Sequence, residues 1–241
     1  MGCWKWRRGT RSACVCTASY TFPLSDVFSR MKTLDQQLLE FRAQRGLAMP
    51  LSGLLVWAAI GVLSFVLTPV QQVMSVFFGT GSIVYIAMVV SRWTGEHFGF
   101  KSRSEWNVFE MIFLSAVGMA VLVYAVTIPF FLENHLALPF AVAVQTGLMW
   151  VVYGAMVAAP VAIVHAIVRT VACTVAFLLA PAEGFWLQPL IVVACYASTI
   201  PLLERRWRLE VARQAAVRSA DAESVHSAGS HRGLTDLPTA H

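Results

Sequence analysis

Charged residues are scarce in this sequence. Only 13% of its 241 residues are Asp, Glu, Lys or Arg, whereas 57% are hydrophobic. A soluble domain of this length leaves too much of its surface in water to hide so much apolar area. The scarcity of charge therefore argues against a water-soluble globular protein and predicts a chain that lies in a lipid bilayer.

Aspartate is missing from the whole stretch between Asp35 and Asp221. This absence excludes an intramembrane aspartyl mechanism and an Asp-rich phosphotransfer site that uses metal. The His-Glu-x-x-His zinc motif is absent as well. A Ser–His pair could be drawn from Ser115 and His165, but nothing in the spacing singles them out. We therefore predict no enzymatic activity, no cofactor and no metal.

A secretory signal peptide and a disulfide framework are also lacking. Residues 1–30 carry several basic residues but no apolar core region or small-residue cleavage site. Three of the five cysteines lie in this segment, while Cys173 and Cys195 lie in apolar runs, where cysteine behaves as a small hydrophobic residue. We predict that Met31 is the natural start and that residues 1–30 are a non-native or disordered extension.

Apolar runs of about 20 residues make up most of what remains, which is the length a helix needs to cross the hydrocarbon core. The runs lack the alternation of a transmembrane β-strand, so they predict helices. The expected fold is an all-α membrane protein. Turns such as Thr68-Pro69 and Ala159-Pro160 separate six predicted spans, at about 47–68, 70–91, 108–132, 136–158, 160–180 and 183–203.

The segments that flank the spans complete the predicted domain organisation. Residues 31–46 place Leu34, Leu38, Phe41 and Arg45 on one stripe, which is typical of a short amphipathic helix at the membrane surface. The six-helix transmembrane domain then covers residues 47–206. Residues 207–241 predict the end of a basic helix and a disordered cytoplasmic tail.

The placement of basic residues predicts the orientation. With the N-terminus inside, the cytoplasmic segments receive all the Lys and Arg residues that flank the spans, and the outer turns receive only Glu133 and Glu183. This is the positive-inside rule, and an even number of spans puts both termini in the cytoplasm. The net charge of +5 is accounted for by this topology, so we predict no nucleic-acid partner. The bias toward Arg and Ala suggests a bacterial inner membrane.

Two halves of the sequence resemble each other in the same order. Leu47-Ala48-Met49-Pro50 matches Leu136-Ala137-Leu138-Pro139, and the stretch from Tyr124 to Pro129 matches that from Tyr196 to Pro201. Units of three spans would face opposite ways, which is the inverted 3+3 repeat of many transporters. The alternative is a chance likeness between segments rich in Leu, Ala and Val.

Arg169 is the residue that most suggests a function. It lies near the middle of the fifth predicted span, where a charge costs about 2.5–3.5 kcal/mol on insertion scales. His165 and Cys173 lie four residues away on the same helix face. No carboxylate is predicted at this depth, so the guanidinium needs neutral polar groups, water or an anion. The alternative is a structural anchor that reaches a backbone carbonyl.

Small polar residues at similar depth in other spans complete a predicted binding site. The candidate residues are Arg169, His165, Gln145, Thr80, Tyr124 and Tyr196. We predict a small transporter or permease-like protein for an anionic or polar solute, with its site near the bilayer midplane. The alternatives are a non-catalytic membrane protein that acts through helix packing with a partner and, third, a lipid-modifying enzyme.

Small-residue pairs at helix-packing spacing suggest homo-oligomer contacts. They are Ala116/Ala120, Ala143/Gly147 and Gly154/Ala158. The other expected partner is the lipid bilayer itself.

From about residue 31 to 206 the chain resembles an uncharacterised family of small bacterial multi-pass membrane proteins, a domain of unknown function. The likeness lies in LDQQLLEFRAQRGLAMPLSGLLVW at the amphipathic start and in FGTGSIVYIAMVVSRW at the end of the second span. The resemblance implies a six-helix fold and a start near Met31, and it implies no activity.

Overall fold

The computed structural model describes residues 33–96 and 107–233. The predictions for residues 1–30 and for the start at Met31 lie outside these residues, as does most of the loop predicted between the second and third spans. The described part from Leu34 onward belongs to one compact unit. It consists of helices and short connections and contains no strand. The all-α fold predicted from the apolar runs is therefore confirmed.

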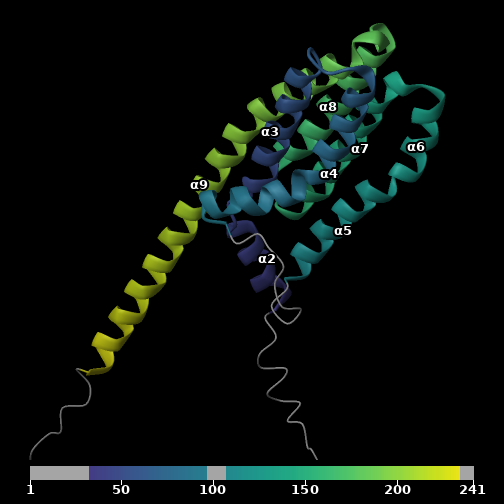
Figure 1. Ribbon diagram of the computed structural model, residues 1–241. Helices are drawn as coiled ribbons and strands as arrows, with labels where there is room; N and C mark the ends of the chain where they lie inside the picture. The colour runs from purple at the N-terminus through teal and green to yellow at the C-terminus, as the bar shows by residue number, and fades with distance from the viewer. Residues whose placement is uncertain (1–32, 97–106, 234–241) are drawn as a thin grey trace, which may run out of the picture. The chain divides into compact units, whose positions relative to one another are not determined.

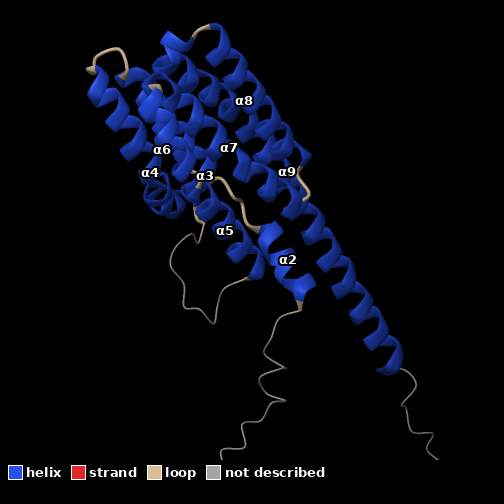
Figure 2. Ribbon diagram, turned by 90° about the vertical axis from the view of Figure 1, so that its right-hand side faces the viewer, coloured by secondary structure: helices blue, strands red, loops and turns tan. Residues whose placement is uncertain are grey.

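Most of the helices run nearly antiparallel in a bundle, while the C-terminal part of α4 lies across the others (Figures 1 and 2). In chain order they are α2 (Leu34–Ala43), α3 (Ala48–Leu63), α4 (Pro69–Thr94), α5 (Val108–Leu122), α6 (Tyr124–Glu133), the 3-10 helix η2 (His135–Ala137), α7 (Leu138–Met156), α8 (Pro160–Leu179), the 3-10 helix η3 (Pro181–Glu183) and α9 (Gly184–Gly233).

Proline and polar caps set the boundaries that the sequence marks. Pro69 and Pro160 each open a helix, where the missing N–H group costs nothing. Thr68 and Gln71 form a capping box at the start of α4. Asn107 accepts the amide of Phe109 and so caps α5. The predicted turns before α4 and α8 therefore have a local physical cause.

Five helical segments among the described residues are long and apolar enough to cross a membrane. They are Pro69–Thr94, Val108–Glu133, His135–Met156, Pro160–Leu179 and Pro181–Val217. A sixth is obtained when α2 and α3, which meet at a bend of 45°, count as one broken span. Several apolar helices of this length fit a membrane-embedded protein.

The first predicted span, 47–68, is shorter in the structure. The helix α3 has 16 residues and spans about 24 Å, less than the roughly 30 Å of a hydrocarbon core. Residues 64–67 leave the helix because their carbonyls find another partner: the side-chain amide of Gln72 donates to the carbonyl oxygens of Ser64 and Leu67 at 2.7 and 3.2 Å. A side chain from the next helix thus ends α3 early.

The last helix is longer than expected. We predicted a span ending near 203, a short basic helix and then a disordered tail, but α9 continues to Gly233. Residues 203–217 are rich in Leu, Arg, Glu and Ala, which are strong helix formers. Local propensity therefore carries the helix on beyond the apolar stretch.

The helix α7 lies at the centre of the bundle. It contacts α4, α5, α6, α8 and α9, while α3 packs between α4 and α9. Within the described residues α4 and α5 barely touch, although they are neighbours in sequence order. The α5–α6 arm runs along the outside of the bundle (Figures 1 and 2). In the most apolar stretch of this arm only 11% of the residues are buried inside the chain.

Arginines tie the helix ends together at one end of the bundle. Arg42 Nε donates to the carbonyl of Met156 at 3.3 Å, and Arg206 donates to the carbonyl of Val157. These carbonyls belong to the end of α7, which has no further helical turn to satisfy them. Arg45 forms a two-pronged salt bridge with Glu204, with both distances 2.9 Å. The segments around 42–45, 94–96, 156–157 and 204–207 thus meet at a basic end.

Candidate polar site at Arg169

The inner face of α8 is built from residues three or four apart. Ala162, His165, Ala166, Arg169 and Cys173 are all buried on this face. The spacing matches the helical repeat, so the small residues let α7 and α9 approach while the two larger polar side chains reach into the core. Arg169 and His165 therefore share one helix face, as the sequence predicts.

Arg169 is completely buried, with 0% of its surface exposed. Its Nη2 atom donates to Thr146 Oγ1 on α7 at 2.8 Å, and Nη1 donates to the Tyr196 hydroxyl on α9 at 3.3 Å. The guanidinium carbon lies 5.5 Å from the centre of the Tyr196 ring and 5.7 Å from that of Trp57, which is within cation–π range. Four helices thus enclose the charge.

A missing side chain makes room for this guanidinium. A Cβ atom on Gly147 would lie 3.2 Å from Arg169 Cδ and 3.3 Å from Nε, closer than most carbon contacts. The glycine lets the backbone of α7 lie directly against the arginine stem. The pairs Ala143/Gly147 and Gly154/Ala158, which we expected in a homo-oligomer contact, include two glycines that face α8 within the chain.

No carboxylate of the described residues neutralises Arg169. Among the described residues no Asp or Glu oxygen lies within ion-pair distance of it, and both of its hydrogen-bond acceptors are neutral hydroxyls. Burying an ionised group without a counter-charge is costly in a medium of low dielectric constant. The site is a buried, uncompensated positive charge.

His165 lies beside this charge in an aromatic cluster. Its Nδ1 atom is 2.8 Å from Thr199 Oγ1. Its ring centre lies 4.8 Å from that of Trp150 and 5.1 Å from that of Tyr196. Tyr196 therefore contacts both Arg169 and His165, which joins the two residues of α8 to α9.

The six predicted site residues fall into three groups. Arg169, His165 and Tyr196 form one cluster. Gln145 is buried and precedes Thr146 in the sequence. Its Oε1 atom accepts a hydrogen bond from Thr127 at 2.5 Å and does not contact Arg169.

The remaining two residues, Thr80 and Tyr124, pair with each other at 3.0 Å. No hydrogen bond or ring contact joins either of them to Arg169 within the described residues. Among the described residues Gln145 makes no hydrogen bond to Arg169, and the neighbouring Thr146 does.

The sequence reasoning missed two tryptophans. Trp57 and Trp150 are buried, and each contacts the cluster through its ring. The available signal was their position: both lie in the interior of a predicted span, whereas membrane tryptophans favour the interfaces. A tryptophan far from an interface has to bury an indole N–H group.

Several buried N–H groups of this region have no hydrogen-bond partner among the described residues. The buried N–H donors without a hydrogen-bond partner in the described part of the chain are Trp57 Nε1, Gln145 Nε2, Trp150 Nε1 and Arg169 Nε. Three further buried atoms also lack a partner there: His165 Nε2, Thr170 Oγ1 and Gln188 Oε1. Buried polar groups are normally satisfied, so such a group of donors requires an explanation. The donor atoms and the positive charge together suit an acceptor that carries negative charge. The described residues contain no group of three or more His, Cys, Asp or Glu side chains placed to hold a metal ion.

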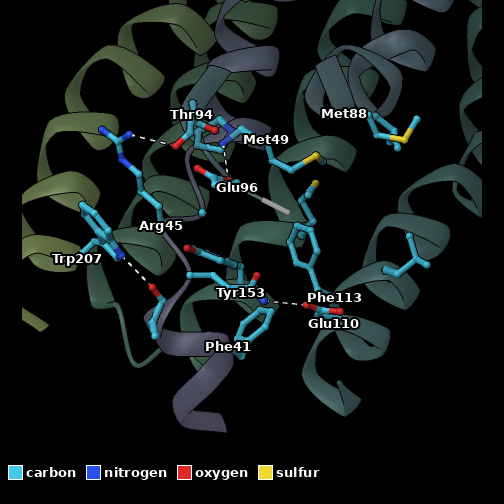
Figure 3. A pocket seen from close by; sticks show the side chains of 18 of the residues that line it. Phe41, Arg45, Met49, Met88, Thr94, Glu96, Glu110, Phe113, Tyr153 and Trp207 are labelled. Carbon is cyan, nitrogen blue, oxygen red and sulfur yellow. Dashed lines mark hydrogen bonds between the residues drawn. The ribbon is translucent and has the colours of Figure 1, made fainter. Parts of the chain in front are cut away.

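A separate cavity of about 600 Å³ opens at the basic end (Figure 3). Arg45, Glu96, Glu110 and Tyr153 supply polar groups, and most of the remaining lining is apolar. Arg169 does not line it. Trp150 does, and this same ring packs against His165 and Tyr196 on its other side. One tryptophan therefore stands between the cavity and the buried cluster.

The comparison with protein families identifies the chain. It belongs to a family of unknown function (DUF7010), whose model matches residues 33–206. The match confirms the family resemblance that the amphipathic start and the end of the second span suggest. Searches among curated proteins and among solved structures find no match.

Proposed function

We propose that this chain is a multi-pass membrane transporter that binds a small anion at Arg169. The observation that carries the proposal is the fully buried guanidinium, whose hydrogen-bond partners among the described residues are neutral hydroxyls. An anion would supply the counter-charge. It would also accept hydrogen bonds from the unpartnered N–H groups of Trp57, Trp150 and Gln145.

The enclosure of Arg169 favours transport over simple binding at a surface. Because the guanidinium has no exposed surface in this conformation, a solute reaches it only in a second conformation. Alternating access supplies such conformations by moving one half of a bundle against the other. The likeness between the two halves of the sequence supports an inverted 3+3 repeat of this kind.

The contacts of two tyrosines also support the repeat. Tyr124 and Tyr196 are equivalent in the sequence likeness. Tyr124 bonds to Thr80 on the second span of its half, and Tyr196 bonds to Arg169 on the second span of the other half. The two halves differ in how closely the backbones of their second and third spans approach. In one half α8 and α9 pack closely, whereas in the other α4 lies close to α5 and α6 at few points.

The proposed topology has six spans with both termini in the cytoplasm of a bacterial cell. The bent pair of α2 and α3 supplies the sixth crossing. The basic end described above contains Arg42, Arg45 and Arg206, and the positive-inside rule assigns this end to the cytoplasm. The inner membrane is the bacterial membrane in which helical proteins of this kind reside.

Anion-dependent thermal stability tests the binding site. We would measure unfolding in a nonionic detergent with phosphate, sulfate, nitrate and a monocarboxylate, for the wild type, Arg169→Met and the control Arg213→Met, whose arginine is exposed. A site occupied at 100 times its Kd stabilises the fold by about 2.7 kcal/mol. We expect at least one anion to stabilise the wild type and Arg213→Met but not Arg169→Met.

Uptake into liposomes tests transport. The anion that stabilises the protein is supplied as a radioactive tracer outside vesicles that contain the protein and the same unlabelled anion. Exchange by the wild type and by Arg213→Met, with none by Arg169→Met, is expected. If no anion distinguishes Arg169→Met from the wild type in either assay, the proposed site is wrong.

One observation favours a second candidate function, binding of a membrane partner. The α5–α6 arm is mostly exposed, and its Ala120 is half-buried one turn after the buried Ala116. Single-molecule photobleaching in nanodiscs distinguishes a monomer from an oligomer. If an oligomer forms and the substitution Ala120→Leu disrupts it, the arm is an interface.

A further inference from the structure

The cavity at the basic end has the size and composition of a ligand site. Its volume of about 600 Å³ is within the roughly 300–1,000 Å³ that small-molecule sites occupy. Side chains from α3, α4, α5 and α7 line it (Figure 3). Several of them are flexible and apolar, including Met49, Met88 and Met149. Methionine surfaces adapt to apolar ligands of varied shape.

The apolar part of the cavity lies between two helices that leave a gap. Val84 and Met88 line it from α4, and Phe113 and Leu114 line it from α5. These helices barely touch in the described residues, so the cavity separates them. Leu114 lines the cavity and is 41% exposed, and the α5–α6 arm that carries it is mostly exposed. The apolar side of the cavity therefore adjoins the surface that hydrocarbon chains cover.

The polar part of the cavity lies at the basic end and contains a carboxylate with neutral partners. Glu96 accepts the backbone amides of Leu47 and Ala48 at 2.8 and 3.2 Å, at the start of α3. Arg45, the cation in the lining, is held by Glu204, and its guanidinium stacks 5.3 Å from the Trp207 ring. The charge of Arg45 is thus matched by a carboxylate outside the lining and interacts with Glu96 without a hydrogen bond, while no cation among the described residues forms a salt bridge with Glu96.

We propose that this cavity binds one hydrocarbon chain of a membrane glycerophospholipid whose headgroup carries an amine. The chain enters between α4 and α5 and packs against Met88 and Phe113. The headgroup lies at the polar end, where the ammonium group pairs with Glu96. The polar end is at the level of Trp207 and the arginines, and such residues mark the membrane interface. An apolar chamber joined to a charged interface matches a lipid better than a water-soluble ligand, which would have no apolar chain to bury.

Lipid retention tests this proposal independently of any solute at Arg169. The protein is purified in a mild detergent with equal amounts of phosphatidylethanolamine and phosphatidylglycerol, and native mass spectrometry counts the bound lipids. Val84→Trp fills the cavity from α4. The matched control is Val89→Trp on the same helix, because Val89 is 47% exposed and does not line the cavity.

We expect the wild type and Val89→Trp to retain one lipid per chain, predominantly phosphatidylethanolamine. Val84→Trp is expected to reduce this occupancy at least tenfold. Equal retention by Val84→Trp and the wild type, or a wild type that retains no lipid, overturns the proposal. Thermal unfolding checks that each variant is folded.

A second pair of variants covers the case in which Val84→Trp does not fold. Leu114→Trp fills the cavity from α5, and Ile112→Trp is its control on the same helix, with 42% exposure and no contact with the cavity. The loss of lipid is again expected only for the cavity-lining position.

Glu96→Gln keeps an oxygen that can cap α3 but removes the charge. It should retain a lipid and lose the preference for the amine headgroup, and an unchanged preference refutes the role of Glu96.

Discussion

Replacing Arg169 by methionine in the absence of anions should leave the fold nearly as stable as the wild type. Methionine is a flexible, unbranched side chain that can fill much of the space of the arginine stem without a charge. The substitution removes the cost of the buried charge, about 2.5–3.5 kcal/mol on insertion scales. It also removes every favourable contact of the guanidinium. The sign of the change depends on which of these two terms is larger.

The favourable contacts of Arg169 are modest. The bond to Thr146 is 2.8 Å long, and a hydrogen bond from a charged group contributes about 1.5–3 kcal/mol. The bond to Tyr196 is longer, at 3.3 Å, so it contributes less. Each cation–π contact with Trp57 and Tyr196 adds about 0.5–2 kcal/mol.

The lower ends of these ranges sum to about 2.5 kcal/mol, which nearly cancels the gain. Thr146 keeps a second hydrogen bond, to the carbonyl of Val142 at 2.7 Å, so its hydroxyl is not left alone. We expect Arg169→Met to change the free energy of unfolding by less than about 2 kcal/mol, since breaking a buried charge pair would cost about 3–5 kcal/mol. An arginine retained at so small a net benefit is better explained by a ligand than by stability.

The assay is thermal or denaturant unfolding of purified protein in anion-poor, nonionic detergent, followed by tryptophan fluorescence. Arg169→Lys is the informative companion, because it retains the charge but cannot reach both Thr146 and Tyr196 with fixed geometry. It should be less stable than Arg169→Met. A loss of more than about 3 kcal/mol for Arg169→Met, together with a stable Arg169→Lys, would refute the reasoning and make the arginine a structural anchor.

Three further substitutions test individual contacts by thermal unfolding and by anion binding. Gly147→Ala places a Cβ atom 3.2 Å from Arg169 Cδ, so we expect the guanidinium to be displaced and anion binding to weaken. Unchanged binding would show that α7 shifts to make room for the added methyl group. Gly46→Ala should lower the free energy of unfolding by at least about 1–2 kcal/mol, because Gly46 has φ +66°. A Cβ atom there would also lie 2.5 Å from the Tyr153 hydroxyl. An unchanged free energy of unfolding would contradict this geometry. Tyr196→Phe removes a hydrogen-bond partner of Arg169 and should lower anion affinity by a factor of roughly 10, the equivalent of about 1.4 kcal/mol. An equal loss of affinity in an unrelated aromatic variant would indicate a general packing effect.

The fold could be predicted from the sequence because lipid imposes simple rules on it. Runs of apolar residues of membrane-spanning length have to be helices, and Pro69 and Pro160 mark where two of them begin. The early end of α3 could not be predicted, since it depends on Gln72, a side chain from the following helix. Tertiary contacts of this kind leave no periodic signal in the sequence.

The candidate site was predictable in its centre and not in its contacts. Arg169 stands out because a charge is rare in the middle of an apolar run. Its neighbours are harder to predict, because a rotation of α7 by one residue exchanges Gln145 for Thr146 as the partner of the arginine. Helix rotation is set by how side chains interlock, and here Gly147 lies against the stem of Arg169.

The two halves of the chain differ in the charge of the residue that bonds to their equivalent tyrosines, and this difference bears on where the functional site lies. In the first half Tyr124 bonds to Thr80, whose hydroxyl also reaches the carbonyl of Val76 at 2.6 Å, so the pair is neutral and satisfied. In the second half the equivalent tyrosine bonds to Arg169, whose Nε atom has no hydrogen-bond partner among the described residues. If the halves descend from one unit, as the proposed repeat requires, the two equivalent tyrosines have partners of different charge, and the position equivalent to Arg169, counted from Pro160 and Pro69, is the apolar Phe78. Stability alone gives no reason for that charge, because its burial without a counter-charge is costly. A bound anion does give a reason, and it predicts that Tyr124→Phe, unlike Tyr196→Phe, leaves anion affinity unchanged.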